Sequence, residues 1–216
     1  MAILEIKNVS YAYEKGNTIL SNTNAAFETG RMYAILGPSG SGKTTLLSLM
    51  GGLDAPKKGA ILLDNVDISE RGLSHYRRES VALIFQSYNL IDYMTPVENV
   101  KLTAKKAPLA ILKQLGLTAE EARRNVLKLS GGQQQRVAIA RTLASDAPII
   151  LADEPTGNLD ENTASEIANI LRESAHELNK CVIVVTHSNE MAKQADVAFQ
   201  LRRGGLQVIP TDNFGR

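Results

Sequence analysis

The sequence lacks the features that mark secreted or membrane-spanning chains. Its 216 residues include one cysteine, Cys181, which excludes an internal disulfide and a cysteine-rich metal site and fits a reducing compartment. The apolar runs at 149–152 and 182–185 are far shorter than the roughly 18 residues that a membrane-spanning helix needs. Glu5 and Lys7 interrupt the apolar N-terminal stretch, so it does not resemble a signal peptide. We therefore expect a cytoplasmic location, with any membrane attachment supplied by another chain.

The sequence also lacks an excess of charge of either sign. It has 24 Lys and Arg against 23 Asp and Glu, for a formal net charge of +1. This balance creates no overall field that would attract nucleic acid or an anionic membrane surface, so we expect no nucleic-acid partner. Repeats, linkers and low-complexity segments are absent as well, and the length suits one ordinary domain.

Strand and helix patterns alternate along most of the chain and predict an α/β fold. Two β-rich segments, 3–13 and 18–27, flank the turn-forming residues 14–17 and predict an antiparallel β region. The short apolar segments 148–155 and 181–187 are typical of parallel strands buried on both faces. A crossover helix is predicted between them by the helical spacing of Ile167, Ile170, Leu171, Ala175 and Leu178. A hairpin is predicted at the C-terminal end, with its turn at Gly204 and Gly205.

The first candidate site is a glycine-rich loop that follows a predicted strand and opens a predicted helix near Lys43. It fits the P-loop pattern of Gly, four residues, Gly, Lys, then Ser or Thr. Its backbone N–H groups can surround phosphates, Lys43 adds a full positive charge, and Thr44 offers a hydroxyl to Mg²⁺. A chance glycine turn would not explain the flanking strand and helix. The residues predicted to bind ATP here are Gly37, Pro38, Ser39, Gly40, Ser41, Gly42, Lys43, Thr44 and Thr45.

The second candidate site is the acidic pair Asp153 and Glu154, which ends the apolar strand at 149–152. Ligands of α/β sheets bind at the carboxyl ends of the strands, where these two side chains would lie. Asp153 could belong to the Mg²⁺ shell, and Glu154 could polarise a water for attack on the γ-phosphate. In isolation the pair could equally be the acidic start of a loop, but its presence in the same chain as a P-loop favours a catalytic role.

The third candidate site is a glycine-rich helix start, in which Ser130 is a natural N-cap and Gly131 and Gly132 leave the backbone donors unobstructed. Val137, Ala140, Leu143 and Ala144 mark the apolar stripe of the helix. Taken alone, this segment could be a plain capped helix or an anion site.

In this order, the three motifs resemble those of the ATPase subunits of ABC transporters. Residues 129–133, Leu-Ser-Gly-Gly-Gln, match the defining signature of that family, and the resemblance covers nearly the whole chain. It implies a single ABC ATPase domain over residues 1–216 with a P-loop NTPase fold. A RecA-like core would comprise 1–86 and 145–216, with the antiparallel β region at its N-terminal end. The polar, mostly helical stretch 87–144 would be an inserted helical subdomain.

The resemblance also implies roles for single polar residues. Gln86 and His187 would complete the catalytic set with Glu154: Gln86 contacts Mg²⁺ and relays motion to the membrane subunit, and His187 is the switch histidine at the γ-phosphate. Asp160 would belong to the D-loop. Tyr13 would stack on adenine, with Tyr11 as the competitor because both lie at the end of the first strand. The Mg²⁺ ligands would be Thr44, Gln86 and Asp153.

In this family two ATPase subunits pack head to tail, so each nucleotide site is shared. The resemblance therefore implies that Ser130, Gly131, Gly132 and Gln133 act on the nucleotide of the opposite subunit. The implied partners are a second copy of the chain and a separate permease that spans the membrane, with ATP and Mg²⁺ as ligands. The implied location is the cytoplasmic face of the bacterial cell membrane.

Segments 85–100 and 154–160 resemble the MacB-like exporters, which include lipoprotein-releasing systems and antimicrobial-peptide transporters. The short form looks most like the Vex-type streptococcal peptide export ATPases. The alternative is a soluble ABC-type ATPase of DNA repair or iron–sulfur assembly. Repair members usually carry long coiled coils, and residues 87–129 show no sustained heptad pattern. A P-loop kinase or a switch GTPase would have no use for the signature.

Overall fold

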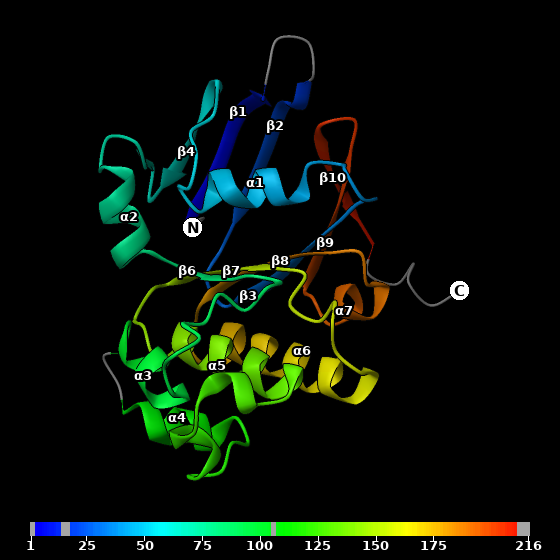
Figure 1. Ribbon diagram of the computed structural model, residues 1–216. Helices are drawn as coiled ribbons and strands as arrows, with labels where there is room; N and C mark the ends of the chain where they lie inside the picture. Colours follow the sequence, from blue (N-terminus) through cyan, green and yellow to red (C-terminus); the bar gives the residue numbers. More distant parts are fainter. Residues whose placement is uncertain (1–2, 14–17, 105–106, 211–216) are drawn as a thin grey trace.

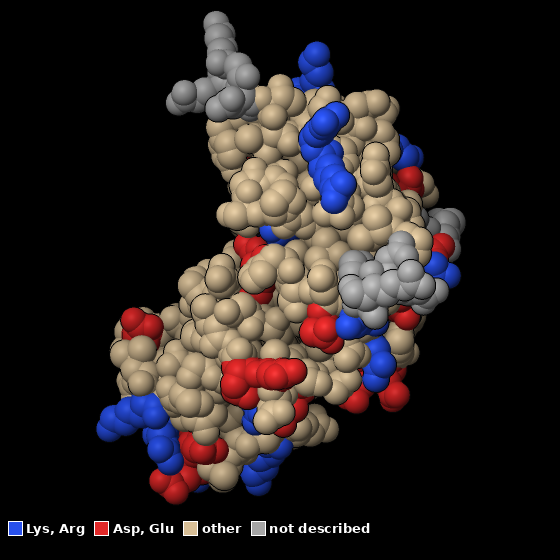
Figure 2. Space-filling view, turned by 90° about the vertical axis from the view of Figure 1, so that its right-hand side faces the viewer, with Lys and Arg blue, Asp and Glu red and all other residues tan. Residues whose placement is uncertain are grey.

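The computed structural model describes residues 3–13, 18–104 and 107–210, and it confirms the α/β fold. The elements form layers (Figure 1), with a four-stranded sheet at one end, helix α1 beneath it, a six-stranded sheet, and then helices α5 and α6 on the opposite face. Figure 2 shows side chains of both charges on one face and a hollow in its outline between the upper and lower parts. None of the described helices is long and apolar enough to cross a membrane.

The smaller sheet is the predicted antiparallel β region. Its strand order is β2-β1-β4-β5, and every neighbouring pair is antiparallel. The strands are β1 (Leu4–Ala12), β2 (Thr18–Phe27), β4 (Lys58–Leu63) and β5 (Val66–Asp67). The turn predicted at 14–17 lies outside the described residues.

The larger sheet has the order β10-β9-β3-β8-β7-β6, in which only β10 runs antiparallel to its neighbour. The strands are β3 (Arg31–Leu36), β6 (Val81–Ile84), β7 (Ile149–Asp153), β8 (Cys181–Thr186), β9 (Val197–Arg202) and β10 (Gly205–Ile209). The predicted C-terminal hairpin is therefore present, but its turn is Arg203 and Gly204, one residue earlier than predicted, because Gly205 already pairs with Arg202 as the first residue of β10.

Most of the predicted helices are present in the described part of the chain. They are α1 (Lys43–Met50), α2 (Leu73–Glu79), α3 (Pro96–Lys101), α4 (Pro108–Gln114), α5 (Gly131–Leu143), α6 (Glu161–His176) and α7 (Asn189–Lys193), with 3₁₀ turns η1 (Glu121–Arg123) and η2 (Val126–Lys128). Helix α6 is the predicted crossover helix, but Leu178 does not belong to its buried stripe. The helix ends at His176, and the Leu178 side chain is 49% exposed.

Two apolar clusters cover the two faces of the larger sheet. Along β8, Ile183 and Val185 face the cluster that includes α1 and the smaller sheet, whereas Val182 and Val184 face the cluster that includes α5 and α6. Because both faces are buried, the strand reads as an unbroken apolar run rather than an alternating one. The second cluster also reaches into α4, so the helices of residues 87–144 share their core with the sheet.

Helices α2 and α7 were not predicted, because neither has a readable apolar period. Helix α2 is anchored mainly by Tyr76, which is fully buried and whose hydroxyl donates to the Met50 carbonyl oxygen at 2.7 Å. A short polar helix with one apolar anchor gives no helical pattern in the sequence.

Gly59 and Gly72 form a matched pair for testing how closely β1 and β4 approach. Their φ angles are +80° and +81°, which L side chains rarely adopt, so alanine is strained at both. A Cβ at Gly59 would strike the carbonyl oxygens of Lys7 and Asn8, whereas a Cβ at Gly72 meets nothing within 4 Å. We expect Gly59→Ala to lower the free energy of unfolding in urea by roughly 1–3 kcal/mol more than Gly72→Ala does. Equal losses would contradict this packing.

Candidate nucleotide-binding and catalytic site

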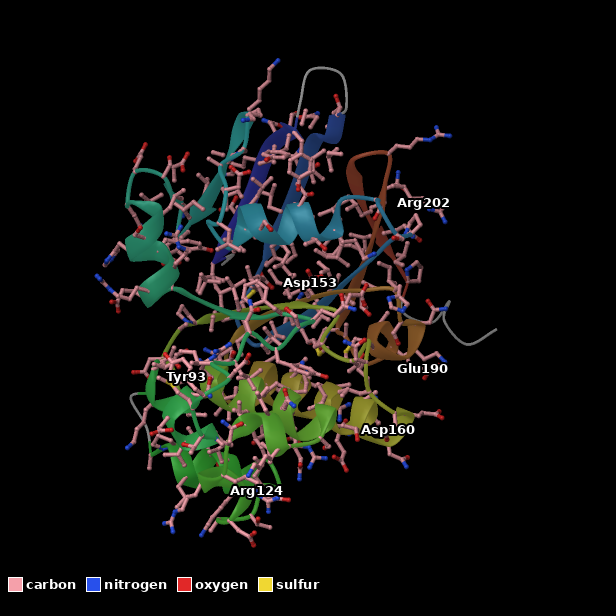
Figure 3. The ribbon with its side chains drawn as sticks, in the orientation of Figure 1. Tyr93, Arg124, Asp153, Asp160, Glu190 and Arg202 are labelled. Carbon is pink, nitrogen blue, oxygen red and sulfur yellow. The ribbon has the colours of Figure 1, made fainter. Side chains whose placement is uncertain are left out.

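The predicted phosphate-binding and acidic residues follow the carboxyl ends of adjacent parallel strands. The glycine loop follows β3, Asp153 ends β7, His187 follows β8, and Gln86 lies just beyond β6. Because these strands are neighbours, their ends meet at one edge of the sheet, and Figure 3 places Asp153 near the middle of the molecule. A cleft of about 710 Å³ at this edge is lined by Tyr13, Ile19, Ser39, Gly40, Ser41, Gly42, Lys43, Thr44, Thr45, Gln86, Asp153, Glu154 and His187.

The glycine loop and α1 form a cradle with unused donors. The N-cap of α1 is Gly42, at φ 97°, and no side chain caps the first turn. The backbone N–H groups there are therefore open to an anion. Ser41 Oγ is buried and has no hydrogen-bond partner in the described part of the chain. A ligand rich in acceptor oxygens, such as a triphosphate, fits this cradle.

Lys43 lies folded over the same loop. Its side chain is only 9% exposed, and Nζ donates to the Gly37 carbonyl oxygen at 2.8 Å and the Pro38 carbonyl oxygen at 3.4 Å. The ammonium is also 3.8 Å from Glu154 Oε1. Gly37 and Pro38 thus contribute carbonyl oxygens that hold the lysine, while the residues after them line the cleft. The arrangement keeps one positive charge at the floor of the cradle.

Thr44, Asp153 and Gln86 could hold a divalent cation. Thr44 Oγ1 donates to Asp153 Oδ1 at 3.4 Å, and Gln86 lines the cleft with them. Burial raises the pKa of Asp153, and the neighbouring Glu154 raises it further. The described residues contain no group of three or more His, Cys, Asp or Glu that could hold a metal unaided. This sparse oxygen set suits Mg²⁺, which usually takes its remaining ligands from water and substrate phosphates.

Glu154 is held by hydrogen bonds from β8 and the residue that follows it. Its backbone lies in the left-handed region at φ 44°, and its N–H donates to the Val185 carbonyl oxygen at 2.9 Å. Its Oε2 accepts from the His187 backbone N–H at 3.2 Å and lies 3.0 Å from His187 Nδ1. The structure therefore brings the two predicted catalytic residues Glu154 and His187 into direct contact at the cleft.

Tyr13 and Tyr11 occupy different environments. Tyr13 lines the cleft, is 65% exposed, and its hydroxyl lies 2.9 Å from Thr45 Oγ1. Tyr11 is 5% exposed, and its hydroxyl donates to Asp54. The two rings meet edge to face with centroids 5.2 Å apart, so Tyr11 supports Tyr13 from behind. Of the two, only Tyr13 is exposed at the cleft, as stacking on a base requires.

The signature residues and Asp160 do not line this cleft. Ser130 caps α5 in a reciprocal arrangement with Gln133: Gln133 N–H donates to Ser130 Oγ at 3.3 Å, and Ser130 N–H donates to Gln133 Oε1 at 3.0 Å. Gln133 Nε2 donates to Glu121 Oε1 at 2.7 Å, so both ends of this amide are engaged within the chain. Asp160 caps α6 by accepting from Thr163 N–H at 3.0 Å, well away from Asp153 in Figure 3.

The sequence analysis missed one residue that lines the cleft and one that holds a neighbouring turn. Ile19 lines the cleft beside Tyr13, and a lone apolar residue in a strand carries no motif. Arg141, near the end of α5, donates from Nη1 to the Asn89 carbonyl oxygen at 2.6 Å and from Nη2 to the Tyr88 carbonyl oxygen at 3.2 Å. It ties the turn after Gln86 to α5. The sequence clue to this role is the position of Arg141 next to the apolar stripe of the helix. Burial lowers the pKa of the Arg141 guanidinium.

Comparison with known proteins identifies the family. Residues 20–157 match the sequence model of the ABC transporter family. The chain is 45% identical to the ABC transporter ATP-binding protein YclH of Bacillus subtilis, over 96% of this chain and 97% of that protein. The chain belongs to the ABC transporter family. It is an ABC ATPase, the ATP-binding component, and the predicted family resemblance is confirmed at this level.

Other relatives of this ABC ATPase carry more specific names. It is 39% identical to the lipoprotein-releasing system ATP-binding protein LolD of Rickettsia bellii, covering 95% of this chain and 98% of LolD. It is 42% identical to the macrolide export ATP-binding/permease protein MacB of Bdellovibrio bacteriovorus, covering 95% of this chain but 33% of MacB. The ATPase is thus related to both LolD and MacB.

A solved relative shows the same fold as a dimer. The dimeric ABC transporter cassette MJ0796, from Methanocaldococcus jannaschii, superposes with a TM-score of 0.87 at 37% identity, covering 96% of this chain and 98% of MJ0796. A second MJ0796 structure, a post-hydrolysis dimer bound to ADP and Pi, superposes with a TM-score of 0.86.

The raised pKa of Asp153 predicts the effect of Asp153→Asn on stability. Since burial penalises its charged form, ionised Asp153 destabilises the folded state at pH values above the ordinary aspartate pKa. Asp153→Asn should therefore leave the unfolding temperature at pH 7, without nucleotide or Mg²⁺, unchanged or higher.

Asp160→Asn is the control of opposite sign. Hydrogen bonds from the Thr163 backbone N–H and hydroxyl lower the pKa of Asp160. The negative charge of Asp160 therefore stabilises the folded state at pH values above the ordinary aspartate pKa, which include pH 7. This substitution should lower the unfolding temperature at pH 7. A loss of stability in Asp153→Asn as large as that in Asp160→Asn would refute the claim that burial makes the ionised Asp153 carboxylate unfavourable in the folded state.

Proposed function

We propose that this ABC ATPase works as a head-to-tail homodimer that couples ATP hydrolysis to a separate membrane-spanning permease. The observation that carries the proposal is the division of the predicted residues into two places. The phosphate loop, the acidic pair and His187 converge on one cleft, while Ser130 to Gln133 begin a helix elsewhere on the same chain. A site built from both sets needs a second copy of the chain.

Within the cleft, ATP phosphates would lie on the loop amides from Ser39 to Thr44, beside the Lys43 ammonium, with Tyr13 against the adenine ring. Glu154 would accept a proton from the attacking water, and His187 would donate to the γ-phosphate. Thr44, Asp153 and Gln86 would hold Mg²⁺, which when bound supplies positive charge against the phosphate oxygens.

From the opposite subunit, Ser130, Gly131 and Gly132 would present the hydroxyl and the uncovered N–H groups of the α5 N-terminus to the γ-phosphate. Gln133, whose amide bonds Ser130 through its oxygen and Glu121 through its nitrogen, would shape this helix start rather than contact ATP. Asp160, at the start of α6, would lie near the subunit boundary. The dimeric structures of MJ0796 support this arrangement.

The permease would dock on the predicted helical subdomain, residues 87–144. Three large apolar side chains there are exposed: Tyr93 at 80%, Leu102 at 51% and Leu127 at 59%. Tyr93 lies near α3 in Figure 3 and follows Gln86 closely in the sequence. Docking at this segment would connect the permease to the cleft through the Gln86 loop.

The similarities to LolD and MacB support an exporter of the MacB-like class, with peptides, antimicrobials or lipoproteins as substrates. The resemblance of the short form, with its segments 88–96 and 181–188, to Vex-type ATPases favours peptides. The ATPase would then lie on the cytoplasmic face of a bacterial membrane, attached through its permease.

Replacing Glu154 with glutamine tests the catalytic assignment. The amide keeps the shape of the side chain but cannot accept the proton, so ATP hydrolysis should slow by about 10²- to 10⁴-fold while ATP binding persists. With hydrolysis blocked, the ATP-bound dimer should accumulate, which size-exclusion chromatography with ATP measures. Wild-type turnover in this variant would refute the role of Glu154.

Lys43→Ala gives the contrasting phenotype. Losing the ammonium at the floor of the cradle removes a charge-assisted contact, so affinity for a fluorescent ATP analogue should fall by about ten-fold or more. This variant should not form the ATP-dependent dimer. Unchanged affinity would mean that the loop does not bind phosphate.

Purification from native membranes tests the transport assignment. A tagged chain should copurify with a membrane-spanning protein, and Tyr93→Asp should weaken that recovery because it places a charge on an exposed apolar contact, without changing ATP affinity. Recovery only in the soluble fraction, together with DNA or iron–sulfur assembly proteins, would favour the soluble ABC-type ATPases instead.

A further inference from the structure

The two carboxylate oxygens of Glu154 lie in different surroundings. Oε1 faces the cleft and lies 3.8 Å from Lys43 Nζ. Oε2 is turned toward β8 and accepts two hydrogen bonds, from Thr186 Oγ1 at 3.0 Å and from the His187 backbone N–H at 3.2 Å, and it lies 3.0 Å from His187 Nδ1. A carboxylate with one oxygen saturated has the other available to accept a proton from water.

The Thr186 hydroxyl is held in a single orientation. Ser188 N–H donates to Thr186 Oγ1 at 3.0 Å, so the hydroxyl accepts on one side and its own hydrogen is left for Glu154 Oε2. Thr186 is fully buried at the end of β8, where it pairs with Leu36, the last residue of β3. A β-branched side chain in a buried strand has restricted χ1 freedom, so the sheet itself fixes this donor.

His187 is a weaker constraint on Glu154 than Thr186 is. Its side chain is 69% exposed, whereas that of Thr186 is fully buried. The predicted role of His187 also requires its ring to turn toward a nucleotide phosphate. When the ring does so, the side chain of Thr186 remains as a fixed donor to Oε2, together with the His187 backbone N–H.

The Glu154 side chain borders two cavities, so it could point into either. It lines the nucleotide cleft and a second cavity of about 380 Å³, which Thr186, Ser188 and Met191 line as well. The carboxylate therefore forms part of the wall between two open spaces. A small rotation would aim it away from the phosphate loop, so its direction must be set by a bonded neighbour.

We propose that Thr186 is a positioning residue that aims the Glu154 carboxylate at the attacking water. This inference rests on the proposed role of Glu154 as the general base. Thr186 does not touch the nucleotide, because it is buried behind Glu154 and does not line the nucleotide cleft. Its contribution is to hold Oε2 so that Oε1 points into the cleft.

Thr186→Val removes the hydroxyl and keeps the branched shape. Misdirecting the base should lower kcat by about ten- to a hundred-fold, since displacement of a reacting group by about 1 Å can cost 10²-fold. KM for ATP and affinity for a fluorescent ATP analogue should stay within about two-fold. Thr186→Ser, which restores the hydroxyl, should recover most of the turnover. Steady-state ATPase assays on the full-length protein measure these values.

A double-mutant cycle with Glu154→Gln separates positioning from general damage to the site. If Thr186 acts through the Glu154 carboxylate, Thr186→Val should cost less than about two-fold in the Glu154→Gln background. Equal fold losses in both backgrounds, or wild-type kcat in Thr186→Val, would overturn the inference. Wild-type turnover in Glu154→Gln alone would instead overturn the proposed base, a result that the single variant reveals independently.

Two comparisons guard against loss of folding. Thr142→Val removes another buried hydroxyl, one that donates only to the Ala138 carbonyl oxygen within α5, and should keep wild-type kcat. If Thr186→Val does not fold, as judged by thermal unfolding, the Thr186→Ala and Thr186→Ser pair asks the same question at smaller volume. The serine variant should be the faster of the two, and equal rates would overturn the proposal.

Discussion

The site depends above all on the in-register pairing of β8 with β3 on one side and β7 on the other. Leu36 pairs with Thr186, and Val185 pairs with Asp153, so three strands end at the same level. The chain leaves each strand there to form the glycine loop, the acidic pair and the turn to His187. A shift of one residue in any of these pairings would turn side chains to the other face of the sheet. The buried apolar residues on both faces prevent such a shift.

Several polar groups at this edge of the sheet are buried, although burial away from water costs them solvation free energy. Lys43 and Thr186 are largely or fully buried, Asp153 has its pKa raised by burial, and Ser41 Oγ is buried without a partner in the described part of the chain. Each would be better solvated in the unfolded chain. The two apolar clusters on the sheet provide the stability that offsets this cost, which is how a binding site can remain open and incompletely satisfied.

The start of α5 contrasts with the start of α1. Gly42 leaves the first turn of α1 without a side-chain cap, whereas Ser130 and Gln133 cap α5 reciprocally. The second arrangement is rigid and complete within one chain, and the first is complete only with a ligand. Thr163, hydrogen-bonded to Asp160, lies 3.0 Å from the position of a Cβ at Gly132, so a larger residue at Gly132 would press on the start of α6. The starts of these two helices therefore lie close together.

The sequence by itself determined the fold class and the position of the motifs along the chain, and it predicted the chemistry that those motifs carry. Glycines, a lysine and paired carboxylates have few other uses in that order, and buried strands have a recognisable apolar composition. It also predicted Ser130 as a helix cap, because capping is decided by residues close in the sequence.

Only the tertiary structure decided which of those residues meet. Tyr13 rather than Tyr11 faces the cleft because β1 turns the Tyr11 ring inward toward Asp54. Leu178 looked helical but lies beyond the end of α6, and α2 has a single apolar anchor that makes no pattern. Thr186 and Arg141 act through partners 32 and 52 residues away, and no local pattern records a contact that forms only when the sheet assembles. Features set by residues close together in the sequence could be predicted from it, whereas contacts between residues far apart in the sequence required the tertiary structure.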